Sequence, residues 1–115
     1  MSTPVVYEVN IDVDPTIADA YLAWLQHHIV QMHTQIEGIT SVSLCKRPKG
    51  VDGAGANWVG FTAYYHISTR AALDDYLEHR AAAMRQDGLN TFGEGKFVGA
   101  RRILDIIPET PQSAE

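Results

Sequence analysis

The sequence predicts an α+β fold in which the elements follow the order β-α-β-β-α-β. Three observations lead to this prediction. Three segments alternate in side-chain character as strands do, and a fourth, near the end of the chain, alternates poorly. Two longer segments repeat apolar residues at helical spacing, and a glycine-rich segment separates the two middle strands. This order is typical of a four-stranded antiparallel sheet with two helices on one face.

The first strand, residues 5–13, has the clearest pattern. Its odd positions are all apolar, whereas Glu8, Asn10 and Asp12 occupy even positions. Successive side chains of a strand point to opposite faces of the sheet. One face of this strand therefore suits a core, and the other carries carboxylates and an amide. The strand should end before Asp14, which suits the N-cap of a helix.

The remaining elements follow in order along the chain. We expect a helix over 17–36, a strand over 40–47, a loop over 48–56 and a strand over 58–67. A second helix should begin at 68 or 69 and last to about 86, and Gly88 should terminate it. A connection over 89–95 and a strand over 96–107 complete the order. Right-handed crossovers would place the first strand beside the third and the fourth. The sequence thus predicts one ferredoxin-like domain, residues 1–107, with a flexible tail over 108–115.

The composition narrows the classes of partner. The chain has 115 residues, 45% of them hydrophobic and 20% charged, and a net charge of −5. An acidic domain repels phosphate backbones, so we expect no nucleic-acid partner. No apolar run reaches the roughly 18–20 residues that cross a bilayer, and the first residues do not form a signal peptide. Cys45 is the single cysteine, which excludes an internal disulfide. We expect a cytoplasmic protein without a membrane partner.

The sheet face away from the helices should carry an unusual mixture of side chains. Its expected members are Glu8, Asn10, Asp12, Ser41, Ser43, Cys45, Trp58, Thr62, Tyr64 and His66. Aromatic side chains on an open sheet face usually meet a second subunit, a ligand, or both. We therefore expect a homodimer with two-fold symmetry, whose sheets face each other.

Three of these residues are candidate catalytic groups. Asn10 and Tyr64 would orient a ligand, and His66 would transfer a proton near neutral pH. The alternative is that the same groups form hydrogen bonds in a wet dimer interface.

Further ligand-binding candidates are Trp58, Glu8, Thr62, His28 and Arg102. Trp58 would form a wall of the cleft. Glu8 should lie beside Arg101 or Arg102, either as a cross-strand ion pair or as the support of an anion-binding arginine. His28 lies on the apolar stripe of the first helix, where it is either a general base or a packed histidine.

Other candidate sites receive little support from the sequence. Arg80 falls within the apolar stripe of the second helix, where it would reach the edge, lie at a bend, or touch a ligand. His28 and His33 are five residues apart and point to different sides of the helix, so we expect no metal site. No sequence feature indicates a cofactor.

The chain resembles a family of small, mostly bacterial proteins classed as a domain of unknown function. The resemblance runs from Val6 to Leu104 and rests on Tyr7-Glu8-Val9-Asn10, Trp24-Leu25, His28-Ile29, Tyr65, Ala72-Leu73, Tyr76-Leu77, Gly88-Leu89, Phe92-Gly93, Phe97 and Arg101-Arg102. It implies a ferredoxin-like fold of the dimeric α/β-barrel type, and it implies no reaction. Val30 stands where family members tend to have proline, and the loop over 48–56 is long.

At the wider level the chain is similar to the dimeric α/β-barrel monooxygenases, cyclases and haem-degrading enzymes. That similarity implies a site built from Asn, Trp or His in the sheet cleft, and Asn10, Trp58 and His66 are of these types. We therefore expect a small-ligand-binding protein, or a cofactor-free enzyme, that acts on an apolar or aromatic molecule in this cleft. The alternative is a non-catalytic homodimeric interaction module whose open face is only an interface.

Overall fold

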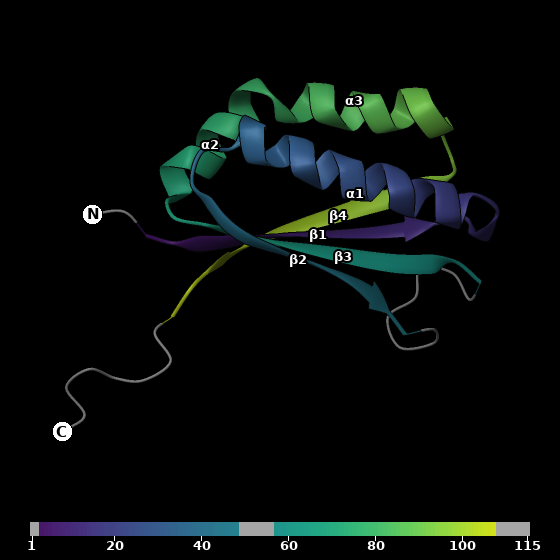
Figure 1. Cartoon of the computed structure of the whole chain (residues 1–115), viewed down its shortest axis with the longest axis horizontal. Helices are drawn as coiled ribbons and strands as arrows, with labels where there is room; N and C mark the ends of the chain where they lie inside the picture. Colours follow the sequence, from purple (N-terminus) through teal and green to yellow (C-terminus); the bar gives the residue numbers. More distant parts are fainter. Residues whose placement is uncertain (1–2, 49–56, 108–115) are drawn as a thin grey trace.

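The computed structural model describes residues 3–48 and 57–107, which form one sheet with helices on one of its faces (Figure 1). The elements are β1 (Val5–Val13), the 3-10 helix η1 (Pro15–Ile17), α1 (Ala18–Gln35), β2 (Ile39–Arg47), β3 (Val59–Ile67), α2 (Arg70–His79), α3 (Ala81–Phe92) and β4 (Phe97–Asp105). The loop expected over 48–56 lies outside the described residues except for its first residue, and the tail expected over 108–115 lies wholly outside them.

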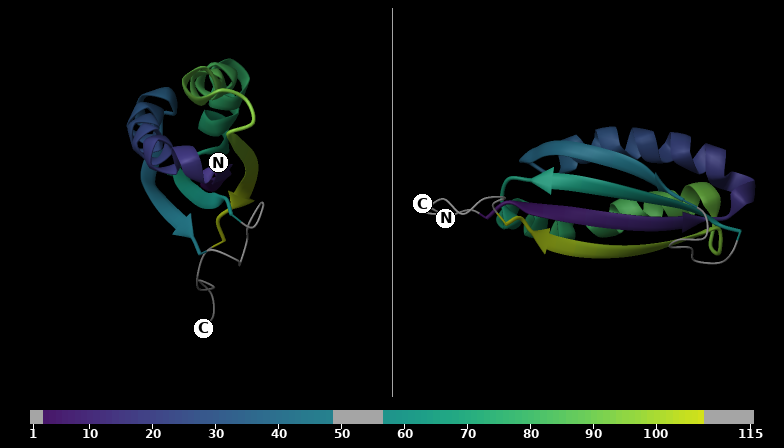
Figure 2. Two further views of the ribbon diagram at one scale, coloured as in Figure 1. Left: turned by 90° about the vertical axis from the view of Figure 1, so that its right-hand side faces the viewer. Right: turned by 90° about the horizontal axis from the view of Figure 1, so that it is seen from below.

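The four strands lie in the order β2-β3-β1-β4, and every neighbouring pair is antiparallel. The right-hand view of Figure 2 shows β1 in the interior of the sheet, with β2 and β4 at its edges. The sequence prediction that the first strand lies between the third and the fourth is confirmed. Glu8 of β1 stands opposite Tyr64 of β3 on one side and opposite Arg102 of β4 on the other.

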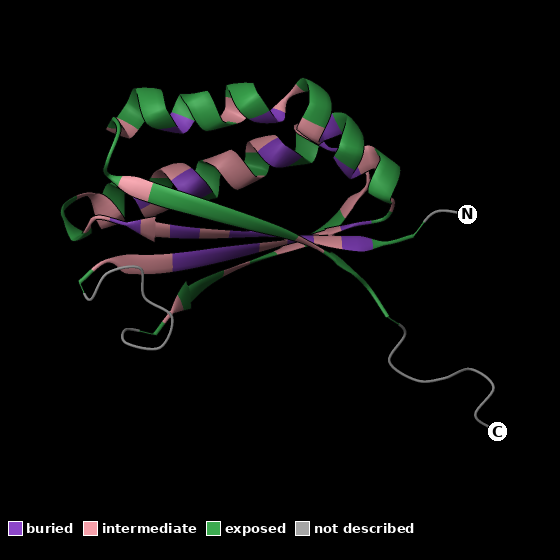
Figure 3. Ribbon diagram, turned by 180° about the vertical axis from the view of Figure 1, so that it is seen from behind, coloured by how far each residue is buried: buried purple, intermediate pink, exposed green. Residues whose placement is uncertain are grey.

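The core lies between the sheet and the helices, because the odd positions of β1 and β3 face that side. Figure 3 shows buried residues along β1, along β3 and on the helices, whereas β4 is mostly exposed. The largest fully buried side chains are Tyr65, Leu25, Met32, Ile36, Ile67, Leu73, Val5 and Val13. None of the helices described is both long and apolar enough to cross a membrane.

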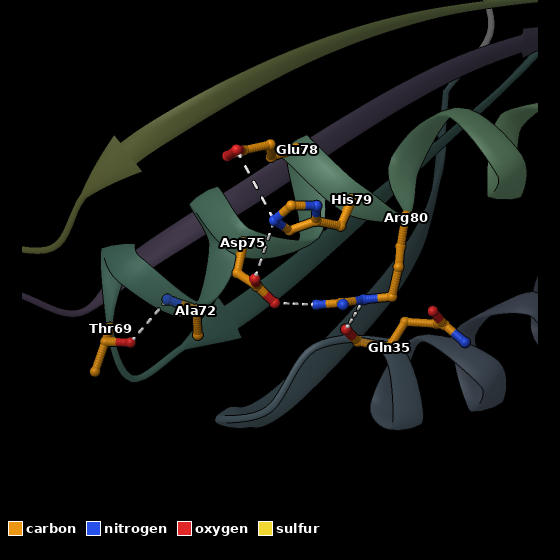
Figure 4. Close-up of polar contacts among 7 residues, drawn as sticks. All are labelled: Gln35, Thr69, Ala72, Asp75, Glu78, His79 and Arg80. Atoms are coloured by element: carbon orange, nitrogen blue, oxygen red, sulfur yellow. Dashed lines mark hydrogen bonds and ion pairs between the residues drawn. The ribbon is translucent and has the colours of Figure 1, made fainter.

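The predicted second helix is two helices in the structure, so three α-helices cover the sheet instead of two. The chain bends at Arg80, whose φ of −130° is not helical, although its backbone N–H still donates to Tyr76 O at 2.9 Å. Arg80 Nε donates to Gln35 O at 2.8 Å, and its guanidinium group pairs with Asp75 (Figure 4). The bend thus joins the helix pair to the end of α1, and it is one of the structural alternatives that the sequence offered for Arg80.

Gly88 does not terminate a helix, contrary to the prediction, because α3 continues to Phe92. The glycine is there for close packing: a Cβ at this position would lie 3.3 Å from Trp24 Cη2 and 3.4 Å from Phe97 Cζ. The helix ends at Gly93, whose φ of +83° is a conformation that glycine adopts without strain.

Two side-chain caps agree with the sequence. Asp14 caps η1, because its Oδ1 accepts a hydrogen bond from Thr16 N at 2.9 Å. Thr69 caps α2, because its Oγ1 accepts from Ala72 N at 3.1 Å (Figure 4). Trp58, expected at the start of the third strand, precedes β3 by one residue.

Candidate functional site

Two hollows lie on opposite faces of the sheet. The helix-side cavity has a volume of about 170 Å³ and is lined by Tyr7, Val9, Ile11, Tyr21, Trp24, Leu25, His28, Met32, Tyr65, Tyr76, Met84, Arg85, Gly88, Leu89, Phe97, Gly99 and Arg101. The open-face pocket has a volume of about 390 Å³ and is lined by Glu8, Asn10, Cys45, Arg47, Thr62, Tyr64 and Arg102. The two hollows differ in the chemistry of their lining residues, and this difference indicates which of them is the better candidate for a ligand site.

A chain of hydrogen bonds crosses the open-face pocket. Arg102 donates to both oxygens of Glu8, at 3.0 Å from Nε and 2.9 Å from Nη2. Asn10 Nδ2 donates to Glu8 Oε2 at 2.6 Å, and Thr62 Oγ1 donates to Asn10 Oδ1 at 2.7 Å. Arg102, and then Asn10, hold the pKa of Glu8 below its ordinary value, although burial opposes them. Glu8 is therefore an ionised partner in an ion pair.

A second ion pair lies on the same face. Arg47 Nη2 donates to Asp12 Oδ1 at 2.5 Å and to Ile11 O at 3.0 Å. The two carboxylates of β1 are thus each paired with an arginine, Glu8 with one from the adjacent strand β4 and Asp12 with one from β2, on the far side of β3. A charged ligand in this pocket would have to displace one of these intramolecular partners.

The structure brings five predicted site residues together in the open-face pocket: Glu8, Asn10, Thr62, Tyr64 and Arg102. It separates three others from them. His66 is on the same face but pairs with Val6, four positions from Asn10, which is roughly 13 Å along the strand. Trp58 precedes β3 and does not line the pocket, and His28 lies on the opposite side of the sheet. Catalytic or binding roles for these eight residues stay predictions.

The helix-side cavity has aromatic walls. The ring of Tyr21 lies 5.4 Å from that of Trp24, 5.1 Å from that of Phe92 and 5.2 Å from that of Phe97. The rings of Tyr21, Trp24 and Phe97 line the cavity and come from α1 and β4, whereas Phe92 of α3 contacts Tyr21 without lining the cavity. Tilted aromatic pairs at such separations stabilise each other beyond their area burial.

His28 is the unusual polar group of this cavity. Its ring stacks on Trp24, with ring centroids 4.9 Å apart and an interplanar angle of 11°. Its Nδ1 atom is buried and has no hydrogen-bond partner among the described residues. Burial lowers the pKa of His28, Asp87 opposes this effect, and Arg101 adds to it. The imidazole is therefore neutral at pH 7.

Four tyrosines, Tyr7, Tyr21, Tyr65 and Tyr76, also line the cavity. Burial raises the pKa of each of them, and the charge of Arg101 opposes the rise in every case. The pKa of Tyr21 and that of Tyr76 reach about 12. At neutral pH the charges among the lining residues are therefore those of Arg85 and Arg101.

The sequence did not identify Arg85 as a site residue, and it left open whether Arg101 or Arg102 lies beside Glu8. The available signal was the adjacent pair Arg101-Arg102, because consecutive residues of a strand point to opposite faces. The pairing of Glu8 with Arg102 decides which arginine lies on the open face and sends Arg101 to the cavity. For metals, no group of three or more His, Cys, Asp or Glu side chains in the described ranges could hold an ion.

The fold and the cavity together define a small ferredoxin-like protein with an apolar hollow between its sheet and its helices. Residues 4–107 match the family model described as "Domain of unknown function (DUF4286)", and the chain belongs to this family. The suspected membership in a family of unknown function is thereby confirmed. No curated protein matches the sequence.

Solved structures share the fold at low sequence identity. A dimeric ferredoxin-like protein from an uncultured marine organism is 9% identical with a TM-score of 0.67, over 94% of this chain and 99% of that chain. A protein of unknown function from Nitrosomonas europaea is 14% identical with a TM-score of 0.62, over 96% and 95%. SnoaB, a cofactor-independent oxygenase from Streptomyces nogalater, is 11% identical with a TM-score of 0.58, over 96% and 100%. These likenesses show the fold alone.

Proposed function

We propose that the protein binds a small, largely apolar or aromatic molecule in the helix-side cavity. The carrying observation is that His28 lines this aromatic cavity, stacks on Trp24, and has a buried Nδ1 without a hydrogen-bond partner among the described residues. Small-ligand sites are mostly apolar and contain a few polar groups that orient the ligand. A buried nitrogen without a partner is costly, and a ligand that donates a hydrogen bond to it would remove this cost.

The volume of the cavity limits the size of the ligand. An apolar protein cavity of about 150 Å³ holds benzene, and the helix-side cavity has about 170 Å³. A ligand with one aromatic ring therefore matches it. The oxygenase SnoaB shares this fold and is described as cofactor-independent, which supports small-molecule chemistry without a cofactor. A neutral His28 could accept a proton from such a ligand.

The binding test uses fluorobenzene, a neutral single-ring probe, observed by fluorine NMR during titration with the protein. We expect line broadening that saturates. Gly88→Leu should weaken it strongly, because the added side chain starts 3.3 Å from Trp24. Ala82→Leu, on an exposed position of α3 outside the cavity, is the matched control. Binding that is unchanged in folded Gly88→Leu protein would contradict this location.

We further propose that the open sheet face is the interface of a homodimer. This face combines paired charges with exposed apolar side chains, and Val98 and Leu104 of β4 are 55% and 37% exposed. Burial of such a face leaves no unpaired arginine or carboxylate among the residues of its pocket. A structural relative is described as dimeric, which supports the same assembly here. Two sheets face to face would leave the helix layer of each subunit outward.

The dimer test places a carboxylate on each face in turn. Val98→Asp should shift the protein toward the monomer in light scattering after size exclusion, because it puts a charge into the interface. Val30→Asp, at a residue of α1 that is 64% exposed, should leave the mass unchanged. The reverse pattern would mean that the copies associate through their helices.

A further inference from the structure

Four of the six arginines of the chain form ion pairs with carboxylates. The pairs are Arg47 with Asp12, Arg70 with Asp74, Arg80 with Asp75 and Arg102 with Glu8. The other two, Arg85 and Arg101, form no ion pair with any carboxylate in the described parts of the chain. Both of them line the helix-side cavity.

These two guanidinium groups reach the cavity from different elements. Arg85 belongs to α3 and Arg101 to β4, and both residues are exposed, so they stand where the cavity meets the surface. Gly99 lies on the same face of β4, and a Cβ there would be in ordinary van der Waals contact with Arg101 Nη1, at 3.4 Å. The charge of Arg101 acts on His28 and on the four tyrosines of the cavity.

The cavity therefore offers three kinds of contact to one ligand. Its aromatic walls suit a planar ring, and its two arginines suit an oxyanion. The Nδ1 atom of His28 has no partner in the described structure, and in the neutral tautomer that carries its proton on Nε2 it is an acceptor. The open-face pocket offers none of this to an anion, because both of its arginines are held by carboxylates.

We propose that the ligand of the helix-side cavity is a single-ring aromatic acid that also carries a hydroxyl group. Its anionic group pairs with Arg101 and Arg85, its ring lies against the aromatic walls, and its hydroxyl donates to His28 Nδ1. This inference rests on the proposed function, because it names the class of ligand for the same cavity.

The test compares probes that differ in one group, by fluorine-detected competition or calorimetry. Benzoate should bind at least about tenfold more tightly than its neutral isostere benzamide, because a charged hydrogen bond is worth more than a neutral one. A hydroxybenzoate isomer should bind about tenfold more tightly than benzoate. Arg101→Gln should remove the preference for benzoate over benzamide, and Arg70→Gln, on an exposed arginine of α2, should keep it.

His28→Phe tests the hydrogen-bonding nitrogen separately from the stacking of the ring, because phenylalanine can still stack on Trp24. This variant should bind benzoate as tightly as the wild type does, and it should no longer bind hydroxybenzoate more tightly than benzoate. Circular dichroism would confirm that each variant is folded, and the comparison of probes on the wild type requires no variant.

The outcomes distinguish this inference from the proposed function. Equal binding of benzoate, benzamide and fluorobenzene to the wild type would overturn the acid proposal and leave cavity binding intact. Binding of benzoate that is weakened by Arg102→Gln but not by Arg101→Gln would place the anion on the open face and overturn it as well. Failure of every probe, fluorobenzene included, would overturn the proposed function itself.

Discussion

The carboxylate of Glu8 accepts two hydrogen bonds from Arg102, a residue 94 positions later in the chain. Glu8 is only 4% exposed and Arg102 is largely exposed, so the arginine covers the carboxylate on the open face. This pair joins the first strand of the chain to the last one, near the middle of the length of both strands.

Glu8→Gln should lower stability at neutral pH and flatten its acid dependence. The folded pKa of Glu8 lies below its unfolded value of about 4.3. The stabilisation is therefore present above the unfolded pKa and is lost as the pH falls through the folded pKa. Urea unfolding at several pH values below neutral measures this effect. Glu94→Gln, at an exposed residue outside any ion pair in the described structure, is the control. Parallel acid profiles for Glu8→Gln and wild type would contradict the prediction.

Alkaline pH should weaken the fold through the buried tyrosines. Burial raises the pKa of Tyr21 and that of Tyr76 to about 12, above the unfolded value of about 10. Their contribution is complete below pH 10 and is lost as the pH rises through the folded pKa. Ultraviolet absorbance of tyrosinate, followed with circular dichroism, checks this. Ionisation of all five tyrosines near pH 10 in the folded protein would contradict it.

Thr69→Ala should destabilise the protein by about 1 kcal/mol, because it removes the side-chain cap of α2. Thr69→Ser keeps the hydroxyl that accepts from Ala72 N and should retain most of the stability. Chemical denaturation measures both variants. Equal losses for the two would show that the methyl group, and not the cap, matters at this position.

Arg80→Lys should cost about 1 kcal/mol, because an ammonium group cannot reproduce the two-sided contact of the guanidinium with Gln35 O and Asp75. The loss should be modest, since both the arginine and the aspartate are partly exposed. Asp75→Asn tests the carboxylate half of the contact alone and should cost less. Hydrogen exchange of α2 and α3 would locate the change, and faster exchange confined to the sheet would contradict the assignment.

The first strand could be predicted in full because both of its faces follow one alternation. The bend at Arg80 could not, since it involves neither glycine nor proline and depends on a carbonyl 45 residues away. Gly88 was misassigned for a related reason: its neighbours Trp24 and Phe97 lie in other elements. A helical glycine and a terminating glycine look alike until those contacts are known.

The open face was predicted from parity, and the register confirms it for the residues within the strands but not for Trp58, which precedes β3. The cavity on the other side was not predicted, because it is formed by residues from six elements that no local pattern connects. His28 was placed correctly on the inward stripe of α1, but its partners could not be inferred from the helix alone.

Arg101 and Arg102 also constrain how this gene can vary. A one-residue insertion or deletion in β4 would exchange the two side chains between the faces. This shift of the strand register would remove Arg102 from Glu8 and would also move the charge of Arg101 away from the cavity. Length changes in relatives should therefore occur outside β4.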